Sequence, residues 1–142
     1  MSQRILEQLS PDECFGLVAS THVGRLVYID ELGPVALPFN YAAVGREIIF
    51  RVEASTMNHV MSQAALAFEV DHVDEEHGTG WSVLLRGSAA EVPIERVSEL
   101  LHRAHGEVPK PWAAGIHNTW IRLSPETVTG RRLGEKHDDL SY

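Results

Sequence analysis

The sequence is short of cysteine, of long apolar runs and of positive charge. Cys14 is the only cysteine in 142 residues, so no disulfide can form within the chain, as is usual in a reducing compartment. No apolar run approaches the roughly 18 residues that a membrane-spanning helix needs. The first residues lack the apolar stretch of a signal peptide. These absences argue against a membrane protein and predict a cytoplasmic location.

Negative charge exceeds positive charge. Lys and Arg total 12 against 20 Asp and Glu, which gives a formal net charge of −8 at pH 7. No basic face is evident that could neutralise a nucleic-acid backbone, so nucleic acid is not expected as a partner. A small anionic ligand held by one or two arginines remains compatible with this balance.

Familiar catalytic and metal motifs are missing. The sequence has no nucleophile elbow, no P-loop and no glycine-rich dinucleotide motif, and it offers no residue that can be named as catalytic. His72 and His77 lie among acidic residues, but their spacing matches no defined ligand pattern. A solvated loop is therefore favoured there, and no metal site is predicted.

The length fits a single domain, 1–142, with room for a real core. Short segments of alternating polarity predict strands around 25–29, 35–41, 47–52, 65–73 and 81–92, with a bulge at Gly87-Ser88, and two closing strand segments at 120–123 and 127–133. Helical patterns predict a turn at 2–8, a helix after the Ser10–Glu13 capping box, and helices at 56–63 and 93–105. A frayed tail is predicted at 135–142.

These elements predict a mainly β fold with a few short helices. Consecutive hairpins imply an antiparallel sheet, and six or seven strands with so little helix usually close into a β-barrel. The barrel is expected to occupy about residues 10–133.

The stretch after the third predicted strand suggests an anion site. Arg51 ends a strand and is followed by Ser55 and Thr56 at the start of a predicted helix. A guanidinium and the free N–H groups of a helix N-terminus both favour a phosphate. The alternatives are an ion pair between Arg51 and Glu53 or Glu69, and simple helix capping by the two hydroxyls.

The chain resembles the FMN-binding split-barrel proteins related to pyridoxamine 5′-phosphate oxidase, in particular the short actinobacterial-type members. The likeness is carried, in family order, by Val23–Leu26, Leu37–Tyr41, Ile49–Arg51, Ala67–Asp71, Gly80–Val83 with Arg86-Gly87, Pro111-Trp112, Trp120–Leu123 and Val128–Arg132. No single segment is specific, but their order and spacing together support the fold.

This resemblance implies a split β-barrel that forms a homodimer, with FMN in clefts between the subunits and a small-molecule substrate. The function implied is that of a flavoprotein oxidoreductase, in which no catalytic side chain can be named because hydride transfer to or from the flavin needs no acid or base from the protein. The cofactor-binding residues implied are Pro38, Phe39, Asn40, Tyr41, Arg51, Val52, Ser55, Thr56, Trp81, Ser82, Trp112 and Arg131. The alternatives for the aromatic residues are core or interface positions.

The sequence departs from the family pattern beside Arg51. Many relatives have threonine, glycine and lysine where this chain has Val52, Ser55 and Met57. Loss of the lysine removes a charge-assisted hydrogen bond, worth roughly 1.5–3 kcal/mol. Two alternatives to an FMN oxidoreductase therefore stay open: a binding module that holds haem or a deazaflavin in the same cleft, and a ligand-free dimer.

Overall fold

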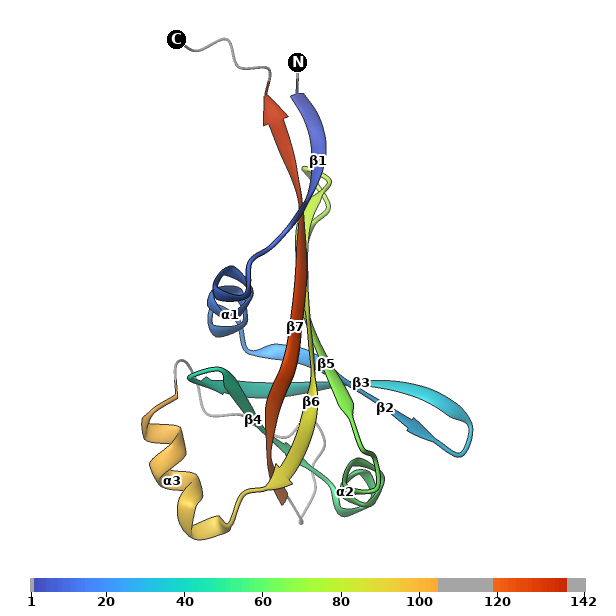
Figure 1. Ribbon diagram of the computed structural model, residues 1–142, viewed down its shortest axis with the longest axis vertical. Helices are drawn as coiled ribbons and strands as arrows, with labels where there is room; N and C mark the ends of the chain where they lie inside the picture. Colours follow the sequence, from blue (N-terminus) through green and yellow to red (C-terminus); the bar gives the residue numbers. More distant parts are fainter. Residues whose placement is uncertain (1, 105–118, 138–142) are drawn as a thin grey trace.

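The computed structural model describes residues 2–104 and 119–137, where seven strands form one antiparallel sheet that closes into a split β-barrel (Figure 1). The strands are β1 (Ser2–Gln8), β2 (Val23–Asp30), β3 (Gly33–Val44), β4 (Glu47–Val52), β5 (Leu66–Asp74), β6 (Thr79–Glu91) and β7 (Thr119–His137). Their order is β1-β7-β4-β3-β2-β5-β6, and β6 also pairs with β7. The barrel therefore closes between β6 and β7, while β1 pairs with the far end of β7.

The predicted bend in β6 allows this closure. The register between β6 and β7 shifts between Arg86 and Gly87. A side chain at Gly87 would collide with the carbonyl oxygen of Ser124, so only glycine fits at this close approach of two backbones. The bulge predicted from Gly87-Ser88 is confirmed.

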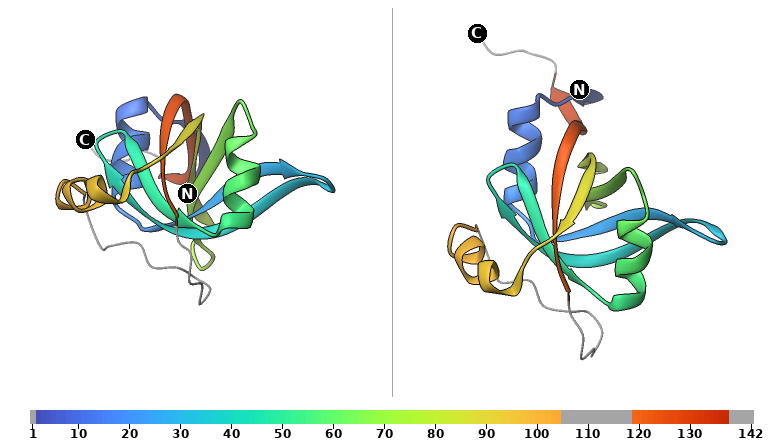
Figure 2. Two further views of the ribbon diagram at one scale, coloured as in Figure 1. Left: turned by 90° about the horizontal axis from the view of Figure 1, so that it is seen from below. Right: turned by 60° about the horizontal axis from the view of Figure 1, so that its bottom comes forward.

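The main core fills the barrel with inward-facing side chains. Phe68 lies at its centre, with ring centroids 5.3 Å from Phe50 and 5.4 Å from Tyr41. Helix α1 (Pro11–Ala19), which begins at the predicted capping box, and helix α2 (Ala54–Met61) add Val18 and Val60 to this core from opposite sides of the barrel (Figure 2).

Helix α3 (Ile94–His102) packs on the outside of the barrel. Its buried residues Val97 and Leu100 join a second apolar cluster with Ile49 of β4 and Trp120 of β7. None of the helices in the described part of the chain is long and apolar enough to span a membrane.

The structure corrects two predictions from the sequence. The helical turn predicted at 2–8 is wrong, because this segment is β1 and pairs along its length with β7, from Ser2 opposite His137 to Gln8 opposite Arg131. A helix of seven residues is marginal by itself, whereas pairing satisfies the backbone hydrogen bonds. The two predicted closing strands are one continuous strand, β7. It also runs through 135–137, the first residues of the predicted tail; residues 138–142 lie outside the described part.

Helix α2 is tied to the tip of the β2–β3 hairpin. The Gln63 amide accepts the Ile29 N–H at 3.0 Å and donates to the Ile29 carbonyl oxygen at 2.5 Å. The His59 ring lies with Nδ1 3.0 Å from the Ser55 carbonyl oxygen and Nε2 3.1 Å from Glu31 Oε1. Both partners only accept hydrogen bonds, so the imidazolium form alone satisfies both. The carbonyl first, and the carboxylate next, raise the pKa of His59.

We expect this tie to stabilise the fold at low pH and to weaken as the pH rises. Because the folded-state pKa of His59 lies above its ordinary value of 6.5, its contribution is fully present below that pH and is lost as the pH rises through the folded-state pKa. The loss of unfolding free energy in His59→Gln, measured by urea denaturation, should be largest below pH 6.5 and should shrink as the pH rises through the raised folded-state pKa of His59. Glu31→Gln should follow the same trend, and a loss independent of pH would contradict the interpretation.

Candidate functional site

Strand alternation divides the predicted site residues on β3 and β4 between the two faces of the sheet. Tyr41 and Val52 are buried in the main core, and the Phe39 ring packs against it. Tyr41 donates its hydroxyl to the Val18 carbonyl oxygen at 2.6 Å, and burial raises the pKa of this phenol. Successive side chains of a strand point to opposite faces, so Pro38, Asn40 and Arg51 face outward. The outer face is therefore the one that can meet a ligand through these side chains.

Arg51 is the cationic residue of this outer face. It lies opposite Trp120 in the pairing of β4 with β7, and its guanidinium carbon is 5.0 Å from the centroid of the Trp120 ring. Its Nε is buried and has no hydrogen-bond partner among the described residues. Within residues 2–104 and 119–137, no carboxylate forms an ion pair with Arg51. The alternative pairing with Glu69 does not occur, because Glu69 pairs with Arg25.

The helix start that follows Arg51 is open. Glu53 occupies the N-cap position of α2 and makes no side-chain capping bond. Ser55 and Thr56 lie in the first turn rather than at the cap, so simple capping does not account for their hydroxyls. The first N–H groups of a helix have no partner within the helix, and they carry the positive end of its dipole. Arg51 and the start of α2 thus form a candidate anion site.

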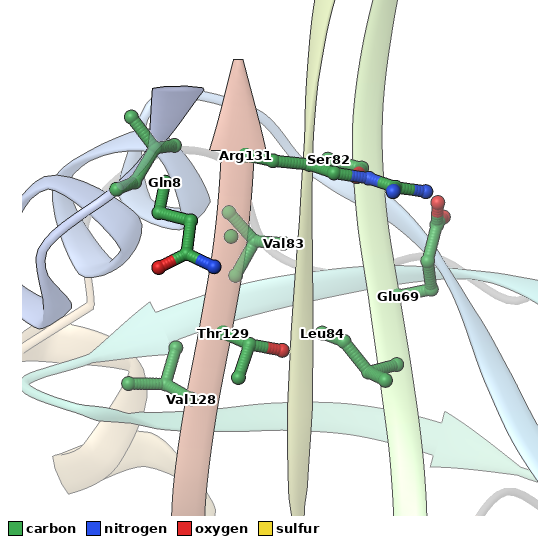
Figure 3. A pocket seen from close by; sticks show the side chains of 10 residues that line it. Gln8, Glu69, Ser82, Val83, Leu84, Val128, Thr129 and Arg131 are labelled. Carbon is green, nitrogen blue, oxygen red and sulfur yellow. The ribbon is translucent and has the colours of Figure 1, made fainter. Parts of the chain in front are cut away.

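A second group of predicted residues lines a groove on another part of the outer face. The groove has a volume of about 510 Å³ and lies over β5, β6 and β7, beside the end of β1 (Figure 3). Its polar side chains are Gln8, Glu69, Ser82, Thr129 and Arg131. Trp81 lines an adjacent hollow of about 380 Å³ that also includes Ser82 and Arg131. Trp112 lies outside the described residues.

Three charged side chains meet at the wall of the groove. Nη1 of Arg25 is 3.2 Å from Oε1 of Glu69 and 3.2 Å from Oδ2 of Asp71. Burial, and next the hydrogen bond and negative charge of Asp71, raise the pKa of Glu69 to about 7, against the opposing effect of Arg25. The Arg131 side chain extends across β6 toward the Glu69 carboxylate (Figure 3).

The sheet register joins the two groups. Pro38 on β3 is opposite Arg25 on β2, and Arg25 is opposite Glu69 on β5. Glu69 is in turn opposite Leu84 on β6, and Leu84 is opposite Thr129 on β7. Directly opposed residues share one face of a sheet. A continuous outer surface therefore runs from Pro38, next to the anion site, to the groove.

The match to known proteins agrees with this architecture. The family described as pyridoxamine 5′-phosphate oxidase matches residues 10–132. The chain belongs to this family.

Relatives of known sequence or structure are similar over nearly the whole chain. The uncharacterized protein Rv0080 of Mycobacterium tuberculosis is 31% identical over 142 residues, covering 93% of this chain and 88% of that protein. The FAD binding protein from Mycobacterium smegmatis is 30% identical with a TM-score of 0.73, covering 89% of this chain and 98% of its own. A FAD-binding protein from Mesorhizobium loti, with a TM-score of 0.75 over 93% of this chain and 99% of its own, is 20% identical and shows the fold alone.

Sequence reasoning about this family member missed Arg25 and Glu69 as site residues. Both lie in segments that carry the family resemblance, and the alternation of Phe68, Glu69 and Val70 already indicated that Glu69 faces outward. Their contact joins positions 44 residues apart. It depends on the register between β2 and β5, which the sequence pattern alone does not specify.

Proposed function

We propose that the protein is a cytoplasmic flavoprotein that binds FMN and acts as a small oxidoreductase, with the flavin phosphate held by Arg51 and the start of α2. The observation that carries this proposal is that, in the part of the chain that the structure describes, the buried Nε of Arg51 lacks a hydrogen-bond partner. Buried polar atoms in native proteins normally have one. A guanidinium binds phosphate through charge-assisted hydrogen bonds, so a phosphate ester would complete this site.

The residues of the chain have separate tasks in this proposal. Arg51, the first N–H groups of α2 and the hydroxyls of Ser55 and Thr56 hold the phosphate, while Trp120 fixes the guanidinium from one side. Pro38 and Asn40 on the outer face of β3 orient the ring. When bound, the flavin supplies the hydride chemistry. The 30% identical relative that is named as a FAD binding protein supports a flavin as the ligand.

Met57 stands where many relatives have a lysine, and its side chain packs against the main core. The phosphate site therefore depends on Arg51 more than a site with two cations would. A lysine at this position can keep its apolar stem against the core and extend its ammonium group to the surface.

We expect Arg51→Ala to weaken FMN binding by about 10–100-fold, because a charge-assisted hydrogen bond is worth roughly 1.5–3 kcal/mol and each 1.4 kcal/mol is about tenfold. A titration of the apo-protein followed by flavin fluorescence measures this. Arg96→Ala, which removes an exposed arginine of α3, is the control and should bind as the wild type does. Met57→Lys should bind FMN more tightly than the wild type, because it adds a second cation to the phosphate site.

The same titration separates the alternatives. FAD, run in parallel, shares the phosphate next to the ribityl chain and tests whether the site also accepts the larger nucleotide. Failure of both the wild type and Met57→Lys to bind FMN up to about a millimolar would contradict the proposal. Titrations with haem and with a deazaflavin would then identify a different ligand, and failure of these too would favour a ligand-free dimer.

We also propose that two copies of the chain pair through the outer face of β5, β6 and β7. Val73, Gly80, Leu133 and Leu6 are successive partners across four strands, so their side chains share one face. Val73 is 64% exposed and Leu133 is 37% exposed. Exposed apolar side chains beside the charged residues of the groove suit an interface between two identical copies, in which each surface meets itself.

Light scattering at micromolar concentration should therefore report a dimer. Leu133→Asp should shift the protein to monomer, because it places a charge within the apolar row. Ile94→Asp is the matched control: Ile94 is 74% exposed on α3, away from the proposed interface, and this variant should remain dimeric. A wild-type monomer, or a dimer unaffected by Leu133→Asp, would contradict this interface.

A further inference from the structure

Glu69 and Asp71 share a single arginine at the wall of the groove. They are successive outward-facing residues of β5, and one nitrogen of Arg25 lies 3.2 Å from an oxygen of each. One cation thus faces two carboxylates at close range. Two negative charges in such a position favour retention of a proton by one of them.

Glu69 is the carboxyl that lies in the groove. Its side chain is 28% exposed, and it lines the groove, whereas Asp71 does not. Burial together with the neighbouring Asp71 raises the pKa of Glu69 to about 7. At neutral pH a large fraction of the molecules therefore carries Glu69 as the neutral acid, which can donate a hydrogen bond.

The charged groups around Glu69 come from four strands. Asp71 lies on β5 itself, Arg25 on β2 and Arg131 on β7. On β6, Arg86 lies two residues after Leu84, which is the cross-strand neighbour of Glu69. The groove also presents the hydroxyls of Ser82 and Thr129. With Glu69 protonated, the carboxyl of Glu69, the guanidinium groups and the two hydroxyls all offer hydrogen-bond donors, whereas Asp71 only accepts. This set of donors suits a ligand with carbonyl oxygens.

The position of Glu69 relative to Arg51 fits a flavin. In the sheet order, β3 and β2 separate β4, which carries Arg51, from β5, which carries Glu69. Neighbouring strands are about 4.8 Å apart, so these three spacings amount to about 14 Å along the outer surface. The ribityl chain and fused ring system of FMN span a comparable length, which brings the ring near Glu69 when the phosphate is at Arg51.

We propose that Glu69 holds a proton at neutral pH and donates it in a hydrogen bond to a carbonyl oxygen of the flavin ring, with Arg25 and Asp71 as its positioning residues. The identity of the ligand rests on the proposed function, whereas the protonation of Glu69 does not. Deprotonation of Glu69 replaces this donor with a negative charge facing the ring oxygen, so the ligand binds less tightly at high pH.

The protonation is tested first without a ligand. In the ¹³C-labelled wild-type protein, the carboxyl resonance of Glu69, assigned with Glu69→Gln, should titrate near pH 7. Asp71→Asn removes the like charge and should move the transition to lower pH, while Arg25→Gln removes the attraction and should move it to higher pH. Titration of Glu69 at the ordinary acidic pH of an exposed carboxyl in the wild type would overturn the inference.

The hydrogen bond is tested by FMN titration between about pH 5.5 and 8.5. Glu69→Gln keeps a donor at every pH, so the ratio of the wild-type Kd to its Kd should rise about tenfold for each pH unit above the transition. Ionisation of the FMN phosphate affects both proteins alike and cancels in this ratio. Glu99→Gln, at an exposed position of α3, is the control and should follow the wild-type curve.

The possible outcomes are distinguishable. FMN binding with parallel curves for the wild type and Glu69→Gln would overturn this inference and leave the proposed function standing. Absence of FMN binding by the wild type at every pH would overturn the proposed function and, with it, the ligand named here.

Discussion

Closure of the sheet between β6 and β7 is the constraint on which the rest of the structure depends. Once closed, each barrel strand has a packed inner face and an outer face, and the period of two along the strand assigns every residue to one of them. Phe50 therefore packs in the core and Arg51 lies on the outer face. In the same way, Phe68 packs in the core and Glu69 lies on the outer face. Gly87 makes this closure possible because no side chain fits against Ser124.

The same closure brings Trp120 at the start of β7 against Arg51 at the end of β4. A cation over an aromatic ring contributes about 0.5–2 kcal/mol, which holds the guanidinium in place, yet its Nε remains unsatisfied. A buried donor without a partner is destabilising by about 1–3 kcal/mol. In the proposed function, the phosphate of the flavin would recover that energy by accepting a hydrogen bond from the guanidinium. Met57 leaves Arg51 as the cation of this site among the described residues near the start of α2.

Much of the fold follows from local patterns in the sequence. The capping box at Ser10, the bulge at Gly87 and the strands around Phe50 and Phe68 depend on neighbouring residues and were predicted correctly. The strand at 2–8 was not predicted correctly, because it becomes a strand only by pairing with β7, which lies far away in the sequence. At Arg51 the family motif is local, so the sequence alone named this residue as a candidate, and its role in phosphate binding stays a prediction. The cluster of Arg25, Glu69 and Asp71 depends on the register of β2 against β5, which no local pattern specifies.

We propose that one outer surface of the barrel holds a flavin, from its phosphate at Arg51 to its ring beside Glu69. A crystal structure of the protein grown with FMN tests this most directly. We expect the phosphate to lie against the Arg51 guanidinium and the first turn of α2. The ring should lie over Pro38, with a ring carbonyl oxygen within hydrogen-bond distance of Glu69. Density for the phosphate at another cation, such as Arg131, with Arg51 left without a ligand, would contradict it.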